Sequence, residues 1–214
     1  MTTVLLRAAS LAVNVAFAFG LPWWLTGRVW VAAAIATVFF GVVAWASRRA
    51  PPYRAACDDV SEIATQVCER LGAPPPRFVG ECDGWTAGVV RSSGGYGFIL
   101  GHRVEPEHRG AVLAHEVAHA LSGDLSWEPW TDGPARLMEP LVQRVPPFGV
   151  ILFPFFLFAA PLARWTELRA DEFAAQHWPG YTAVLRAVAD KMSVRASLFY
   201  PSLDARITRS ARHS

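Results

Sequence analysis

Two long apolar runs near the N-terminus dominate the hydrophobic pattern of the chain. The first is an uncharged stretch of 20 residues from Ala8 to Gly27, and the second is one of 19 residues from Val29 to Ser47. Each is close to the roughly 20 residues that a helix needs to cross the hydrocarbon core of a bilayer. Only Arg28 separates them, so we predict a transmembrane helical hairpin over residues 1–49.

A cleaved signal peptide is the alternative for the first run, with Ala16-Phe17-Ala18 as its small-residue cleavage site. The hairpin is favoured because the second run follows at once and Arg7 alone makes a weak basic leader. Basic residues follow the second run at Arg48, Arg49 and Arg54. Under the positive-inside rule they place the rest of the chain in the cytoplasm, and we expect a multi-pass protein of the inner or plasma membrane.

Beyond residue 50 the pattern changes to shorter amphipathic segments that are typical of a globular domain. Helical spacing predicts helices over 53–71, Pro106 to Leu121, 164–176 and 181–193, and alternating segments predict strands at Arg77–Cys82, Trp85–Arg91 and Tyr96–Leu100. We therefore predict an α+β domain over residues 50–214, mainly helical with a small sheet.

A third uncharged run covers 19 residues from Val145 to Ala163 and contains four prolines. Prolines at this density break a straight helix, and the charges between residues 124 and 144 leave no room for a preceding span. If residues on both sides of the run share one site, a single crossing is excluded. We predict a proline-bent re-entrant or interfacial insertion at about 145–163, with a buried core stretch as the alternative.

The composition favours a membrane-associated protein over a nucleic-acid binder. Hydrophobic residues make up 52% of the chain and charged residues 18%, below the roughly 25% typical of soluble domains. The net charge of +2 lacks the basic excess of nucleic-acid binders. The expected partners are the lipid bilayer and, from the chemistry below, a polypeptide substrate, with no nucleic acid; the sequence is silent on oligomeric state.

The residues with the most informative spacing are His115-Glu116-Val117-Ala118-His119, inside the predicted helix that begins at Pro106. Residues four apart share one face of a helix, so His115 and His119 can present two imidazoles to one ion. Glu116 lies about 100° round the helix, beside the metal and outside its ligand set. This HExxH spacing is typical of zinc metallopeptidases, and its helical context makes a chance match the weaker interpretation.

A catalytic zinc takes three protein ligands and leaves one position for water. Glu167 and Asp171 lie four residues apart on the next predicted helix, so Glu167 can be the third ligand. Asp171 can then accept a hydrogen bond from a ligand imidazole and fix its tautomer. On spacing alone, a solvated acidic face paired with Arg164 and Arg169 is an equally good interpretation.

The chain resembles the HtpX and CAAX-prenyl-protease family of integral-membrane zinc metallopeptidases. The likeness rests on His115–His119 followed by Asp124, on Glu167-Leu168-Arg169-Ala170-Asp171, and on a late segment from Pro201 to Ile207. The resemblance implies a zincin-like (gluzincin) fold and one zinc ion held by the two imidazoles and Glu167. It also implies endopeptidase activity at the membrane.

Two departures from the family pattern bear on substrate contacts: Tyr200 stands where the family often has His, and Gly84-Trp85-Thr86-Ala87 where it often has an Asn-Ala pair. In the expected mechanism, Glu116 takes a proton from a zinc-activated water and delivers it to the leaving amine. Arg206 and Tyr200 are candidate oxyanion donors, although salt-bridge and core roles are commoner for such residues. We also expect one of the last two predicted strands to hold an extended peptide by its edge.

We therefore expect a membrane-anchored zinc-dependent endopeptidase that acts on unfolded or membrane proteins. The alternatives are a membrane protein that binds metal without catalysis and a regulatory metallopeptidase that acts on one partner. Glu116 favours the enzyme, because a structural zinc needs no base beside it. For Asp124 the choice lies between orienting the metal-binding helix and a plain surface position.

Overall fold

The computed structural model describes residues 2–47, 53–85, 87–92, 94–127, 130, 134, 144, 146–191 and 200–213. It is mainly helical with one small mixed sheet, which confirms the predicted α+β class at this level. The chain divides into two compact units. The apolar unit consists of Met1–Arg49 and Ser126–Trp165, and the sheet unit consists of Ala50–Leu125 and Thr166–Ser214.

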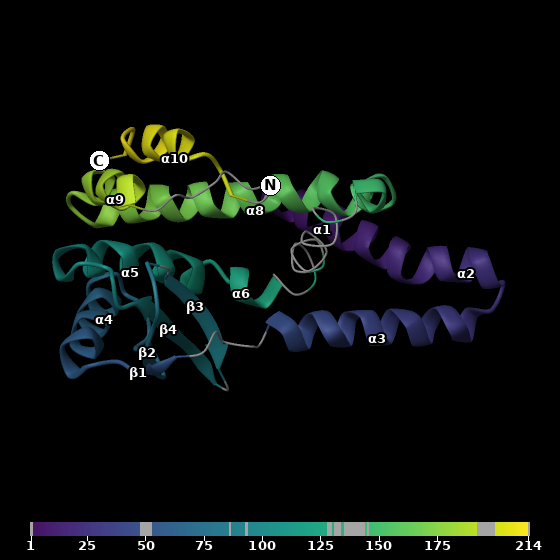
Figure 1. Ribbon diagram of the computed structural model, residues 1–214, viewed down its shortest axis with the longest axis horizontal. Coiled ribbons are helices and arrows are strands. Elements are labelled where there is room, and N and C mark those ends of the chain that lie inside the picture. The colour runs from purple at the N-terminus through teal and green to yellow at the C-terminus, as the bar shows by residue number, and fades with distance from the viewer. Residues whose placement is uncertain are drawn as a thin grey trace. The chain divides into compact units, whose positions relative to one another are not determined.

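The N-terminal part of the apolar unit is a helical hairpin (Figure 1). Its elements are α1 (Thr2–Val15), the π-helical η1 (Ala16–Gly20), α2 (Leu21–Thr26) and α3 (Val29–Ser47). The first three form one helical stretch, of which η1 and α2 pack against α3. The helix continues past Pro22, and the chain reverses at Gly27, whose φ of 64° is a left-handed conformation that glycine adopts without strain.

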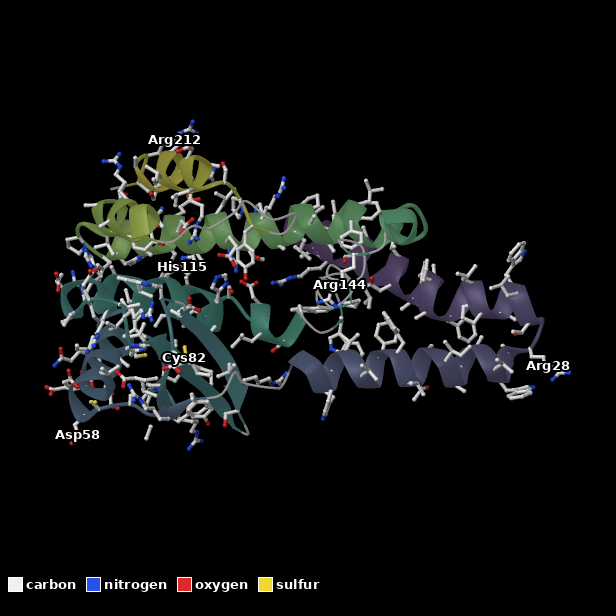
Figure 2. All side chains as sticks on the ribbon, in the orientation of Figure 1. Arg28, Asp58, Cys82, His115, Arg144 and Arg212 are labelled. Atoms are coloured by element: carbon white, nitrogen blue, oxygen red, sulfur yellow. The ribbon has the colours of Figure 1, made fainter. Side chains whose placement is uncertain are left out.

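The first helical stretch has the dimensions of a membrane span. Val4–Thr26 is long and apolar enough to cross a bilayer, and only 17% of its most apolar 18-residue part is buried. Val29–Trp45 is a shorter apolar helix. Arg28 lies at the tip of the hairpin, between the two helices (Figure 2).

The sheet of the second unit has its strands in the order β1-β2-β4-β3. The strands are β1 (Arg54–Ala55), β2 (Val79–Cys82), β3 (Ala87–Ser92) and β4 (Gly95–Gly101). β2 and β4 are parallel, and the other two pairs are antiparallel. β4 therefore lies inside the sheet and β3 lies at its edge. Of the two strands considered as peptide-binding edges, the one at Tyr96–Leu100 is wrong, because it corresponds to β4.

In the sheet unit, α5 packs against β3 and β4, and α8 lies on the other side of α5 (Figure 1). The helices of this unit are α4 (Asp58–Arg70), α5 (Pro106–Leu121), the part of α8 from Thr166 to His177, α9 (Tyr181–Lys191) and α10 (Leu203–Ser210). The division between the two units falls within the short helix α6 (Asp124–Trp127). One hydrophobic cluster joins α4, β4, α5, α8 and α9 through buried residues that include Val67, Phe98, Leu113, Val117, Ala174 and Leu185. α5 approaches Trp178 so closely that a Cβ on Gly110 would lie 2.3 Å from the indole ring.

α8 (Pro146–His177) is one helix of 32 residues where the sequence suggests two separate elements. Two of the four prolines occupy its first turn, where the missing N–H has no partner to lose. Pro154 and Pro161 each remove one interior hydrogen bond, yet the helix continues on both sides of them. The expectation that prolines break the run at 145–163 is therefore wrong, because helix formation is cooperative and neighbouring bonds persist; Val145 lies outside the described residues.

Smaller differences from the predicted elements occur at their ends. The helix expected over 53–71 begins at Asp58, because Arg54 and Ala55 pair with β2 as a short strand. α10 is not foreseen by the pattern. The helix expected over 181–193 is described as far as Lys191.

Candidate metal centre

Three side chains from two helices converge inside the sheet unit. His115 projects from α5 toward α8 (Figure 2), and its Nε2 atom lies 3.2 Å from that of His119, one turn further along α5. The Oε2 atom of Glu167, on α8, lies 3.4 Å from His115 Nε2, and its Oε1 atom lies 3.8 Å from His119 Nε2. The structure thus brings together the three residues that the sequence predicts as ligands.

The spacing of these atoms fits a small divalent cation. In a tetrahedral site with bonds of about 2.0–2.2 Å, neighbouring donor atoms lie about 3.3–3.6 Å apart. The distance between the two Nε2 atoms and that between His115 Nε2 and Glu167 Oε2 lie close to that range. With one ligand atom taken from each residue, all three atoms lie within 4.8 Å of one another. Glu167 and His115 are 8% and 7% exposed, so this buried group of two imidazoles and one carboxylate can hold a metal ion.

The Nδ1 atom of His115, which faces away from the candidate metal position, lies within hydrogen-bond distance of a fully buried carboxylate. Asp171 Oδ1 lies 3.0 Å from His115 Nδ1, and Asp171 is 0% exposed. Arg206, on α10, donates to both oxygens of Asp171, from Nε at 2.8 Å and from Nη2 at 2.7 Å. The hydroxyl of Tyr181 also donates to Asp171 Oδ1, at 2.6 Å. A histidine whose far nitrogen donates to a carboxylate is fixed in the tautomer that frees Nε2 for a metal.

His119 has a similar but looser support. Asp124 Oδ2 lies 3.4 Å from His119 Nδ1. The same oxygen accepts hydrogen bonds from Ser122 Oγ and, at 2.7 Å, from Arg169 Nη2. Asp124 thus ties the end of α5 to α8, which favours the orienting role over the plain surface position.

Burial and ion pairing set the charges of the site. Burial alone would lower the pKa of His115, but its hydrogen bonds to Asp171 and Glu167 outweigh burial and raise the pKa to about 10. Burial alone would raise the pKa of Glu167, but the hydrogen bond with His115 and the nearby positive charges lower it to about 2. The pKa of Asp171 is also lowered against burial, chiefly by Arg206. The carboxylates are therefore ionised at neutral pH, as metal ligation and its support require.

The structure also describes the other residues that the sequence predicts near the metal site. Glu116 follows His115 on α5 and is 8% exposed. Arg206 lies at the site, with Nη2 4.0 Å from Glu167 Oε2, but its hydrogen bonds go to Asp171. Tyr200 is exposed at the surface. A solvated acidic face is wrong for Glu167 and Asp171, because both side chains are buried.

Sequence reasoning missed Tyr181 as a member of the site and saw Arg169 only as a partner of a surface acidic face. Tyr181 is the first residue of α9 and is 4% exposed. The chain reverses before it at Gly180, with φ of 77°. A glycine at this position predicts a turn after α8, but the contact between Tyr181 and Asp171 depends on how α9 packs.

Comparison with known proteins returns no family model, no curated protein and no solved structure that matches this chain. The likeness to the membrane metallopeptidases therefore rests on the motif residues.

Proposed function

We propose that this protein is a membrane-anchored zinc endopeptidase of the HtpX and CAAX-prenyl-protease type, with a zincin-like sheet unit. The observation that carries the proposal is the convergence of His115, His119 and Glu167 with Glu116 next to them on the same helix. Two imidazoles and one carboxylate are the ligand set of several zinc peptidases, and they suit zinc better than the all-oxygen sites preferred by magnesium or calcium. When bound, the zinc would activate a water molecule and polarise the peptide carbonyl.

The chain's own residues have distinct tasks in this reaction. The imidazoles of His115 and His119 and the carboxylate of Glu167 would hold the ion. The carboxylate of Glu116 would accept the proton of the attacking water and return it to the leaving amine. Asp171 and Asp124 would keep the Nδ1 atoms of the two imidazoles protonated, so that their Nε2 atoms remain free to bind.

The sheet supports recognition of an extended peptide. Within the part of the chain that the structure describes, β3 pairs on one side only, with β4, and packs near α5, which carries the two candidate ligand histidines. An extended segment can add to such an edge through main-chain hydrogen bonds, which depend little on side-chain sequence. Recognition of this kind suits unfolded or membrane proteins as substrates.

The membrane part of the proposal rests on the helical hairpin. Both of its helical stretches would cross the inner or plasma membrane, with the sheet unit in the cytoplasm as the basic residues after α3 indicate. α8 carries the apolar run and Glu167 on one helix. Since Glu167 shares a site with His115, the apolar run would lie in the interface or re-enter the bilayer without crossing it.

The decisive experiment compares the zinc-loaded, detergent-purified protein with its Glu116→Gln variant on casein as an unfolded substrate. Glutamine keeps the size of the side chain but cannot accept the proton, so we expect cleavage to fall by about 100-fold or more while zinc content is unchanged. Glu107→Gln, an exposed position on the same helix, is the matched control and should cleave normally. Equal cleavage by wild type and Glu116→Gln would exclude the endopeptidase.

A further inference from the structure

Tyr181 is a buried phenol that the proposed hydrolysis does not use. Its hydroxyl donates to Asp171 Oδ1 at 2.6 Å and lies 3.1 Å from His115 Nδ1. Its ring is nearly parallel to the His115 ring, with an angle of 5° and centroids 6.4 Å apart. The phenol thus contacts both the candidate ligand and the carboxylate that supports it.

The three polar atoms form a closed triangle whose protons can be assigned. Asp171 Oδ1 accepts from the Tyr181 hydroxyl and lies 3.0 Å from His115 Nδ1. The ionised carboxylate of Asp171 has no proton, and the Tyr181 hydroxyl donates its only proton to Asp171, so neither group can donate a hydrogen bond to His115 Nδ1. The hydrogen bond between His115 and Asp171 therefore needs a proton on Nδ1, so Nε2, which faces the candidate metal position, is the nitrogen that a metal ion can occupy.

The backbone places this hydroxyl accurately. The chain leaves α8, turns at Gly180 and begins α9 at Tyr181, whose N–H donates to the carbonyl of Trp178 at 3.2 Å. Asp171 is 0% exposed, so its oxygen depends on protein donors. Arg206 donates to both oxygens of Asp171, and the phenol also donates to Oδ1.

We propose that Tyr181 is a positioning residue, which holds His115 in its Nδ1–H form and ring orientation through Asp171 and thereby sets the affinity of the site for zinc. This inference rests on the metal site of the proposed function and is independent of whether the protein cleaves peptides.

The test measures zinc affinity of the full-length protein in detergent, with a competing chelator, for wild type, Tyr181→Phe and Tyr96→Phe. Removing a group that orients a ligand typically costs about 10–100-fold in metal affinity, and we expect about 10-fold for Tyr181→Phe. Tyr96 is also a buried phenol with hydrogen-bond partners, but these are Cys68 and the Pro74 carbonyl. Tyr96→Phe should lower the melting temperature and leave zinc affinity unchanged.

Two further readouts separate positioning from general loosening of the fold. The visible spectrum of bound Co²⁺ should change in Tyr181→Phe and not in Tyr96→Phe, because it reports ligand geometry. In an Asp171→Asn background, Tyr181→Phe should have little further effect on zinc affinity, since the phenol acts through that carboxylate. Wild-type zinc affinity in Tyr181→Phe, or equal losses in both phenol variants, would overturn the inference. A zinc-binding wild type that leaves casein intact would overturn the peptidase alone.

Discussion

The two units of the molecule bury opposite kinds of side chain. In the apolar unit, large hydrophobic side chains lie on the outside: Val15 is 44% exposed, Val38 65% and Trp24 79%. In the sheet unit, acidic side chains lie inside, with Asp171 at 0% and Glu167 at 8% exposure. Each unit thus departs from the usual rule that apolar groups are buried and charged groups are exposed.

The two departures point to different causes. Apolar surface that continues along a helix of membrane-spanning length, Val4–Thr26, favours contact with hydrocarbon chains. Buried charges persist only when they are paired or bind an ion, and those of the sheet unit gather around one point. The comparison therefore predicts that charge is harmful on the outside of one unit and indispensable inside the other.

The largest effect is expected from removal of the buried carboxylate that we propose as the third ligand. Glu167→Ala should lower zinc affinity by more than about 100-fold, because loss of a supporting group already costs about 10–100-fold. Metal analysis after dialysis measures it. Glu172→Ala on the same helix removes the partner of Arg209 and His213 outside the site, and should retain zinc. Stoichiometric zinc in Glu167→Ala would remove that residue from the coordination sphere.

The reverse test places a charge on the outside of the apolar unit. Val15→Arg, near the middle of Val4–Thr26, should reduce membrane insertion by about 100-fold, since Arg at the centre of a spanning helix costs about 2.5–3.5 kcal/mol. Val29→Arg, beside Arg28 at the hairpin tip, is the matched control and should insert normally. The protein remaining in alkali-washed membranes gives the measurement.

Val38→Arg examines α3 separately, because a single crossing would leave that helix outside the hydrocarbon core. If all three arginine variants stay with the membrane like wild type, the hairpin does not span it.

The parts of the site that could be predicted are those set by local periodicity. His115 and His119 share a helix face because they lie four residues apart on one helix. Glu167 and Asp171 share a face for the same reason. Their meeting across α5 and α8 is a tertiary contact, which the likeness to a known motif suggested and periodicity could not. Tyr181 was missed because its place depends on the angle at which α9 leaves the turn.

The fold shows the same division between local and tertiary information. The predicted helix from Pro106 to Leu121 agrees with α5, whose limits are set by a helix-starting proline and the glycine after its end. The short strand at Arg54–Ala55 forms only because β2 lies beside it. Pro154 and Pro161 misled the prediction, since their local cost is visible in the sequence and the helical context that tolerates them is not.

A moderate effect should distinguish the supports of the two imidazoles. Asp171→Asn should weaken zinc binding within the range of about 10–100-fold, and Asp124→Asn by less. The reason is that Asp171 lies 3.0 Å from His115 and is fully buried, whereas Asp124 lies 3.4 Å from His119. Competition titrations of both variants give the ratio, and a larger loss in Asp124→Asn would reverse the assignment.

The smallest effect for a single step, about tenfold for one pH unit, is the dependence of zinc affinity on pH. Because the pKa of His115 is raised to about 10, both ring nitrogens of this residue are protonated in the metal-free protein at neutral pH. Zinc must displace one of these two protons. Affinity should therefore rise about tenfold per pH unit between about pH 6 and 8, whereas an imidazole of ordinary pKa near 6.5 would level off above neutrality. Competition titrations across this range measure the slope.

The interactions that raise the pKa of His115 also stabilise the metal-free fold. This stabilisation is fully present below pH 6.5, the ordinary pKa of histidine, and is lost as the pH rises through about 10. Asp171→Asn removes the main group that raises the pKa, so this variant should show a flatter dependence of zinc affinity above neutrality. An equally steep slope in Asp171→Asn would show that the displaced proton is not held by the buried pair of His115 and Asp171.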